Sequence, residues 1–295
     1  MSPRHLLLVN PSAGVGRSRK LLGAAQAELD RAGVEHRLVL TRDLEHGIAE
    51  ARAAAEAGER VIVMSGDGLI GQVGGALAGT GAVLGIIPAG RGNDLARVLG
   101  IPTDVRGAVA AIAGGEVRTI DVGEANGARF LCIASCGFDS VVNQRANETR
   151  LLRGSFVYAY AALRTLASWK PASFTLTLDG ERVAVRGYSV AAANSSAYGG
   201  GMYIAPDARL DDGLVDVVAT AEGSKLKFLR ALPSVFKGEH VKRPEVHVWR
   251  VREVRIEADR PFKVFADGDP ITELPATVRV LPSALRVIVP REAVR

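Results

Sequence analysis

The chain has few cysteines, few aromatic side chains and no long hydrophobic run. Its two cysteines among 295 residues, Cys132 and Cys136, share one apolar segment. This pair excludes a disulfide framework and favours a reducing cytoplasm, and we expect both side chains to be buried. The first apolar run, Leu6–Val9, is too short for a signal peptide or a membrane span, and no later segment reaches about 18 uncharged apolar residues. We therefore expect a cytoplasmic protein whose membrane contact is peripheral.

The charge balance is only mildly basic. Lysine and arginine number 37 against 32 acidic residues, a net charge of +5. This surplus suits an anionic small ligand or an anionic membrane surface, and it is too weak to indicate nucleic acid as a partner. Apolar residues make up 47% of the chain, enough to bury one large core or two ordinary ones.

The hydrophobic pattern changes near residue 122. Before it, short apolar runs at 5–9, 37–41, 60–65 and 82–88 alternate with helical patterns, which predicts a parallel Rossmann-like sheet covered on both faces. After it, Asn126-Gly127 and Asp179-Gly180 are typical hairpin turns. We predict an α/β domain over 1–122 and an antiparallel β-sandwich domain over 123–295, whose last strand or tail could return to the first domain.

Three glycine-rich loops follow predicted strands: residues 10–16, 65–71 and 88–94. Because ligands of parallel sheets bind at the carboxyl ends of the strands, we expect these loops to converge on a nucleotide or phosphate. The second loop contains Gly66, Gly68 and Gly71, the G-x-G-x-x-G spacing of a dinucleotide turn. It also contains Asp67, whose carboxylate would repel a pyrophosphate unless a divalent cation lay between them. The pattern favours a metal-bound nucleoside phosphate over a dehydrogenase turn or a plain tight turn.

The motifs N-P-S-A-G, S-G-D-G-L-I-G-Q-V and P-A-G-R-G-N-D together resemble the catalytic domain of the diacylglycerol kinase-like lipid kinases, a family that includes sphingosine and ceramide kinases. Two later segments, P-D-A-R-L-D-D-G-L-V-D and F-A-D-G-D-P, are similar to further motifs of this family. The resemblance covers nearly the whole chain in order, and it is strongest for the soluble bacterial branch.

The resemblance implies ATP and Mg²⁺ as cofactors and assigns roles by position. The nucleotide would lie against Asn10, Pro11, Ser12, Ala13, Gly14, Thr41, Ser65, Gly66, Asp67, Gly68, Leu69, Ile70, Gly71, Arg91 and Asn93. Asp67 would also serve magnesium. A structural magnesium loop would take the Asp212 side chain with the carbonyls of Arg209 and Leu214. The catalytic residues would be Asp67, Asp267 and Asp269, and either of the last two could be the general base.

Several positions depart from the family pattern, and Ser65 stands where the family has the first glycine of its phosphate loop. Leu69 and Arg91 replace two threonines, and Asp269 replaces a glutamate that is one methylene longer. We interpret Arg91 as a replacement phosphate ligand, because a guanidinium can hold phosphate in a bidentate manner.

Four functions stay open at this point. The favoured one is an ATP-dependent kinase of diacylglycerol or a related lipid alcohol; the others are an NAD kinase-like phosphotransferase, a non-catalytic nucleotide- or lipid-binding homologue, and a dehydrogenase. A lipid substrate would fit the basic, amphipathic stretch 225–243, which could lie transiently on an anionic membrane or simply pack on the sheet. A homodimer is compatible with the sequence.

Overall fold

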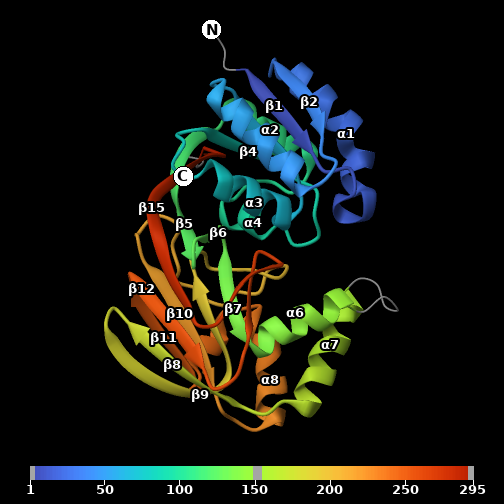
Figure 1. Cartoon of the computed structure of the whole chain (residues 1–295). Coiled ribbons are helices and arrows are strands. Elements are labelled where there is room, and N and C mark those ends of the chain that lie inside the picture. The colour runs from blue at the N-terminus through green and yellow to red at the C-terminus, as the bar shows by residue number, and fades with distance from the viewer. Residues whose placement is uncertain (1–3, 149–154, 292–295) are drawn as a thin grey trace.

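The computed structural model describes residues 4–148 and 155–291, in which one continuous sheet joins two differently built halves (Figure 1). In the first half the four predicted strands are parallel and stand in the order β4-β3-β1-β2. They are β1 (His5–Val9), β2 (His36–Leu40), β3 (Arg60–Ser65) and β4 (Val83–Pro88). Strands β1 and β4 are buried along their whole length, as a sheet covered on both faces requires.

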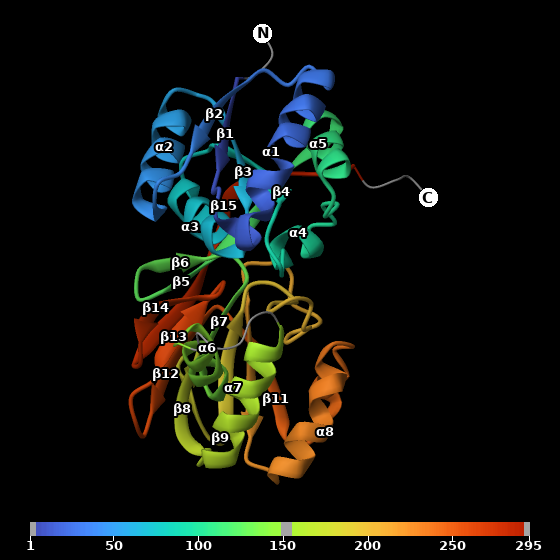
Figure 2. The same cartoon turned by 90° about the vertical axis from the view of Figure 1, so that its right-hand side faces the viewer.

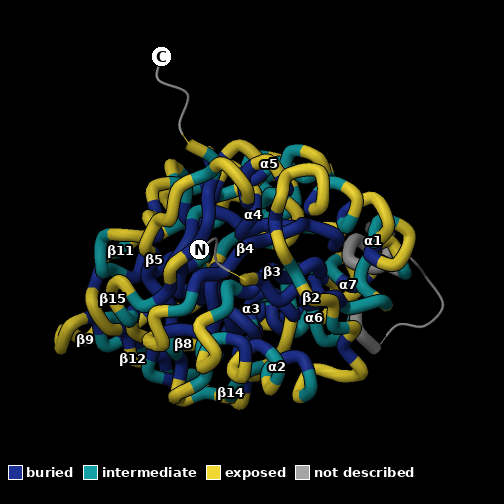
Figure 3. The backbone as a smooth tube through the Cα atoms, turned by 90° about the horizontal axis from the view of Figure 1, so that it is seen from above, coloured by how far each residue is buried: buried dark blue, intermediate teal, exposed yellow. Residues whose placement is uncertain are grey.

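Helices cover both faces of this parallel sheet. One face carries α1 (Ala13–Arg31) and α5 (Val105–Gly114), and the other carries α2 (Leu44–Glu56) and α3 (Asp67–Leu77), as Figure 2 shows. The short helix α4 (Asp94–Val98) follows β4. Seen from above, β3 and β4 are buried while the outer helices expose one side to solvent (Figure 3). Helix α1 begins earlier than its apolar pattern predicted, so much of the first glycine-rich loop lies in its first turn.

The second half is the predicted antiparallel sheet. Its strands are β5 (Glu116–Ala125), β6 (Ala128–Phe130), β7 (Ile133–Gly137), β8 (Ala172–Leu178), β9 (Glu181–Ala193), β10 (Val215–Ala221), β11 (Val246–Val251), β12 (Glu253–Ala258), β13 (Lys263–Ala266), β14 (Asp269–Glu273) and β15 (Ala276–Val289). Both predicted hairpin turns are present, with Asn126 and Asp179 in the left-handed conformation that two-residue hairpins need.

Helices α6 (Phe138–Glu148), α7 (Ser155–Ser168) and α8 (Lys225–Val235), with the short helix η1 (Glu239–Lys242), lie beside this sheet (Figure 2). The patterns predicted α7 and α8. They did not predict α6, whose sequence is polar and lacks a clear apolar stripe.

Two long strands connect the halves. β5 pairs antiparallel with β15, from Glu116 opposite Val289 to Ala125 opposite Val278. Near its end, β15 also pairs in parallel with β4, where Arg286 lies opposite Val83. Residue 122 lies inside β5, so the halves share a strand rather than a linker. One hydrophobic core fills the first half and extends to β7 and β9 of the second, and another lies within the second half. The division into domains 1–122 and 123–295 stays a prediction.

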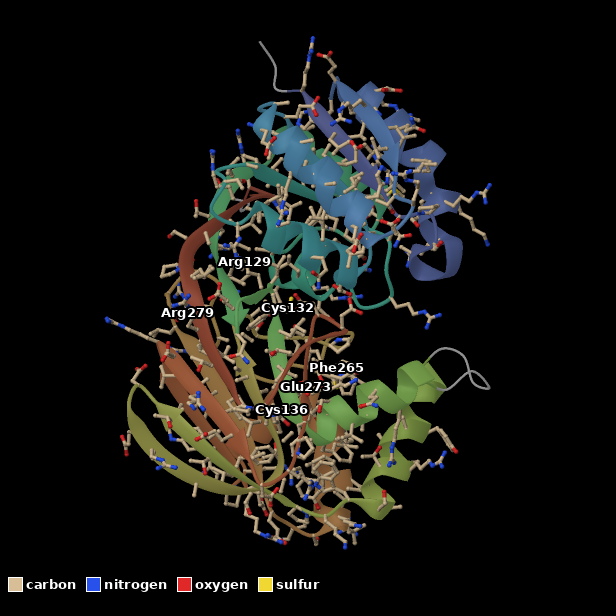
Figure 4. All side chains as sticks on the ribbon, in the orientation of Figure 1. Arg129, Cys132, Cys136, Phe265, Glu273 and Arg279 are labelled. Carbon is tan, nitrogen blue, oxygen red and sulfur yellow. The ribbon has the colours of Figure 1, made fainter. Side chains whose placement is uncertain are left out.

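Helix α3 packs against β6 and Leu131 of the second half. A Cβ atom at Gly74 would meet the Leu131 side chain, and one at Gly75 would lie 3.0 Å from Arg129 Cβ. Arg129 also donates to the carbonyls of Gly75 and Ala78 at the end of α3, at 2.9 and 3.0 Å. Figure 4 shows Arg129 and Cys132 beneath this helix and Cys136 farther along β7. Both cysteines are buried as predicted.

Candidate active site

The three glycine-rich loops meet at the end of the parallel sheet that faces the second half (Figure 1). They touch one another at glycines. A Cβ atom at Gly14 would collide with the carbonyl oxygen of Ala89, and one at Gly90 would lie 2.5 Å from the Cα of Gly66. Side chains are thus excluded from the contact, and the backbone N–H groups that begin α1 and α3 remain close together. This is the arrangement that binds phosphate at helix N-termini.

The first loop is held by its own polar groups. The Asn10 side chain accepts from the Ser12 N–H at 2.9 Å, and Ser18 donates to the Asn10 carbonyl. Pro11, Ser12 and Ala13 are at least partly exposed at this turn. The residues that the sequence assigned to the nucleotide therefore stand together here, with Ser65–Gly71 and Arg91 from the other two loops.

The side chain of one predicted nucleotide contact, Leu69, points elsewhere. Leu69 and Thr41 are each 8% exposed. The Leu69 Cδ1 and the Thr41 Cγ2 both face Gly47 of α2. Position 69 lies on the side of α3 that turns toward α2 and the apolar core, so a larger apolar side chain fits where the family has a threonine. Leu69 could serve a phosphate only through its backbone.

Asp67 ties the second loop to the third. Its carboxylate accepts from the backbone N–H groups of Asn93 and Asp94 at 2.8 and 2.7 Å, at the start of α4. Asn93 is left-handed, and its side chain bonds back to the N–H and carbonyl of Gly90, which fixes the turn. Burial, and next the charge of Asp94, raise the pKa of Asp67. Arg91 extends from this loop into solvent.

Two buried acidic residues were not predicted from the sequence: Asp94 beside Asp67, and Asp121 beside the turn Arg209–Leu214. Asp94 is 5% exposed and accepts from Gly200 and Gly201 of the second half at 2.9–3.0 Å. Asp121 is 2% exposed and accepts from Gly213 and Ser283, both at 2.7 Å. Asp94 stands in the quoted motif G-R-G-N-D, so the available signal was its place beside Asn93. No local pattern distinguished Asp121.

Asp267 and Asp269 differ in what their carboxylates contact. The Asp267 carboxylate accepts from the N–H groups of Leu131 and Cys132, at 2.7 and 3.0 Å. A Cβ atom at Gly71 would lie 2.8 Å from it. Asp269 is an exposed residue, and one of its oxygens lies 3.0 Å from where a Cβ of Gly68 would stand. Asp267 thus anchors the hairpin turn against α3, whereas the Asp269 carboxylate is open at the phosphate loop.

The burial of the Asp267 carboxyl predicts a pH dependence of stability. Burial raises the pKa of Asp267 to about 6. Because this value is above the ordinary one, protonated Asp267 stabilises the fold below about pH 4, and that stabilisation is lost as the pH rises through 6. We expect Asp267→Asn to remove this slope from the free energy of unfolding, measured by urea denaturation with EDTA and no nucleotide. Glu56→Gln, at an exposed site of α2, is the control. Equal slopes for wild type and Asp267→Asn would contradict the assignment.

Oxygen ligands suited to a divalent cation occur at two places. Asp67 lies in the glycine-rich loop 65–71 beside Asp94, and a cation there would offset the repulsion that adds to the rise in the pKa of Asp67. In the turn Arg209–Leu214, Asp212 accepts from the Leu214 N–H at 3.1 Å. Near this turn, one carboxylate oxygen of the buried Asp216 has no hydrogen-bond partner. Asp212 and Asp207 add to the rise in the pKa of Asp216, after burial.

The predicted ligand set of the turn has one side chain and two carbonyls. Over the described ranges 4–148 and 155–291, no group of three or more His, Cys, Asp or Glu side chains is placed to hold a metal. That finding does not test a site built mainly from carbonyls, so the assignment of Arg209, Asp212 and Leu214 stays a prediction.

Comparison with known proteins agrees with this geometry. Residues 4–125 match the family described as the diacylglycerol kinase catalytic domain, and residues 132–289 match the YegS C-terminal NAD kinase beta sandwich-like domain. A diacylglycerol kinase of Mycobacterium tuberculosis is 39% identical over 96% of this chain and 94% of its own length. One from Bacillus subtilis is 27% identical over 98% and 97%.

A solved structure described as a diacylglycerol kinase from Bacillus anthracis has the same fold. Its TM-score is 0.76 at 21% identity, covering 99% of this chain and 98% of that one. The sequence match extends over both halves and includes all the glycine-rich loops as well as the hairpin that carries Asp267 and Asp269. The chain therefore belongs to the diacylglycerol kinase family and is an enzyme of the lipid kinase type.

Proposed function

We propose that the protein transfers the γ-phosphoryl group of ATP, with Mg²⁺, to the hydroxyl of diacylglycerol or a related lipid alcohol. The observation that carries this proposal is the contact between Asp269 and Gly68. It brings a carboxylate of the second half to the first turn of α3, within the glycine-rich loop 65–71. A phosphoryl acceptor bound between the halves would meet both groups.

The residues of the first half would position the donor. Phosphoryl transfer needs orientation and charge neutralisation more than covalent chemistry. The N–H groups that begin α1 and α3 would bind phosphate oxygens, and Arg91 is exposed and free to reach them. Asp67 would hold the loops at 65–71 and 88–94 in register through its bonds to Asn93 and Asp94. Magnesium, when bound, would supply neutralisation of the phosphate charge.

Asp269 is the general base that we propose. A base must come within about 2.6–3.2 Å of the hydroxyl proton. The Asp267 carboxylate already accepts from two backbone N–H groups, whereas partial burial of the Asp269 carboxyl raises its pKa and leaves it open toward the loop. Asp269 would therefore take the proton from the acceptor hydroxyl, and Asp267 would fix the turn that presents it.

The direct test is transfer of labelled γ-phosphate from ATP to a panel of acceptors. We expect product with diacylglycerol or another lipid alcohol, and none with NAD. Product with NAD alone would replace the proposal by an NAD kinase-like activity. Bound nucleotide without product on any acceptor would instead identify a non-catalytic homologue.

We also propose a peripheral membrane contact through α7 and α8. Residues 155–170 and 223–238 contain no acidic residue and six basic ones. Among the described residues, no helix could span a bilayer. Exposed apolar side chains accompany the charges: Tyr160 and Leu163 on α7, and Leu226 and Phe236 at the two ends of α8. A face of this kind fits an anionic lipid surface.

Removing charge from this face should weaken membrane binding. Arg230 and Lys237 are exposed, and each should contribute about 1 kcal/mol near an anionic surface. We expect Arg230→Gln with Lys237→Gln to reduce partitioning onto phosphatidylglycerol vesicles by roughly 10- to 30-fold, measured by co-sedimentation. The matched control removes the exposed Arg52 and Arg106 of α2 and α5. An equal loss in the control would show that net charge, rather than this face, decides binding.

A further inference from the structure

A short segment of the second half reaches from the phosphate site to α8. We call residues Tyr198–Met202 and the following Tyr203 the strap. Tyr198 and Met202 exchange backbone hydrogen bonds of 3.0 Å, which close a small loop. The tip of this loop is three glycines, Gly199–Gly201, all left-handed. The N–H groups of two of them hold the Asp94 carboxylate at 2.9–3.0 Å.

The tip of the strap is thereby connected to the phosphate loop. Asp94 is buried, and its own N–H donates to Asp67 at 2.7 Å. The base of the strap is fixed as well, by the paired backbone hydrogen bonds between Tyr198 and Met202. A displacement of Gly200 would move the Asp94 carboxylate, which Gly200 holds. It would thereby alter the hydrogen bonds that Asp67 accepts from Asn93 and Asp94.

The other end of the strap is attached to α8. The Tyr203 N–H donates to the Val235 carbonyl at the end of α8, at 3.0 Å. The next residue, Ile204, is hydrogen-bonded through its carbonyl to His240 of η1 at 3.1 Å. Helix α8 itself has no buried residue; Phe228 and Leu229 pack on the core, and Phe228 stacks on Tyr188 at 4.3 Å. Helices with few buried contacts move at low cost in free energy.

We propose that the strap couples docking of α8 on an anionic bilayer to the geometry of Asp94 and Asp67, so that the membrane increases the rate of phosphoryl transfer. This inference rests on the proposed function. A bilayer that binds one position of α8 better than another shifts the population toward that position. Tyr203 is hydrogen-bonded to the end of α8 and directly follows Met202, which pairs with Tyr198. A shift of α8 therefore reaches the glycine tip through a short connection.

The test separates docking from catalysis with a soluble acceptor. Transfer to a short-chain, water-soluble diacylglycerol is measured with and without phosphatidylglycerol vesicles that contain no acceptor. We expect vesicles to raise the wild-type rate at least about 5-fold, the lower end of usual allosteric couplings. Inserting two glycines between Met202 and Tyr203 lengthens the chain between the glycine tip and α8. The insertion leaves the Tyr198–Met202 pairing, the Gly200 and Gly201 contacts and α8 intact. The insertion should keep vesicle binding and the unstimulated rate but abolish the stimulation.

The control inserts two glycines after Gly180, in a hairpin turn of the second half, and should retain the stimulation. Stimulation that survives the Met202–Tyr203 insertion would overturn the coupling, as would vesicle binding that leaves the wild-type rate unchanged. Amide hydrogen exchange at Gly200 and Gly201 gives a readout without catalysis. Vesicles should change it in the wild type and not in the insertion variant. Altered exchange without transfer to any acceptor would support the coupling while contradicting the proposed reaction.

Discussion

Asp269→Asn is expected to lower kcat for phosphoryl transfer by about 100- to 10,000-fold, with little change in the KM for ATP. The asparagine has nearly the same shape but cannot accept a proton from the acceptor hydroxyl. Because Asp269 is exposed and has only a partly desolvated carboxyl, the fold should tolerate the change. Steady-state kinetics with a lipid acceptor, together with thermal unfolding, would measure both effects.

Asp269→Glu is the informative companion. It restores the residue that the family pattern has at this position, and it keeps the carboxylate while extending it by one methylene. We expect it to retain activity within about 10-fold of the wild type, because general-base catalysis depends first on a carboxylate within reach. Wild-type kcat in Asp269→Asn would remove the residue from the role of base, whatever the glutamate variant does.

Asp67→Asn should reduce kcat/KM by at least about 100-fold. Both Asp67 oxygens accept from backbone N–H groups, of Asn93 and Asp94, at the start of α4. In the asparagine, an N–H donor replaces one acceptor oxygen and would point at a backbone N–H of Asn93 or Asp94. The turn at 90–94 would therefore move away from the loop 65–71. The negative charge near the expected magnesium would also be lost. Kinetics at saturating and limiting Mg-ATP would separate binding from turnover.

A matched control exists in the same half of the chain. Asp104 caps α5 by accepting from the Gly107 N–H at 2.8 Å, in the way that Asp67 holds α4. Asp104→Asn should cost about 1 kcal/mol or less in the free energy of unfolding and leave kcat/KM near wild type. If both variants lost activity alike, helix capping rather than the phosphate site would explain the result for Asp67.

Some of the fold and site could be predicted because the signals are local. Continuous apolar runs identified β1, β3 and β4, and the hairpin turns at Asn126 and Asp179 identified the antiparallel half. Alternation of strand and helix then placed three glycine-rich loops at one sheet edge, since parallel strands share the direction of their carboxyl ends. The loops do meet there, through glycine contacts that no side chain could replace.

The helix α6 and the inward side chain of Leu69 were not predictable in the same way. The polar sequence of α6 has no strong apolar period, and its place depends on packing against α7 and β7. For Leu69, the family comparison suggested a lost nucleotide contact, whereas the start of α3 at Asp67 turns the side chain to α2. Helix phase, rather than residue type, decided that contact.

The sequence by itself determined the parallel and antiparallel halves and the meeting of three glycine-rich loops at one edge of the parallel sheet. Only the tertiary structure separated Asp267 from Asp269, because the bonds of Asp267 to Leu131 and Cys132 span more than 130 positions of the chain. It also gave the G-x-G-x-x-G spacing its meaning. Gly71 admits the Asp267 carboxylate against α3, so this glycine serves the contact between the halves rather than a dinucleotide. Local patterns fix secondary structure, whereas such contacts depend on which distant groups the fold brings within a few ångströms.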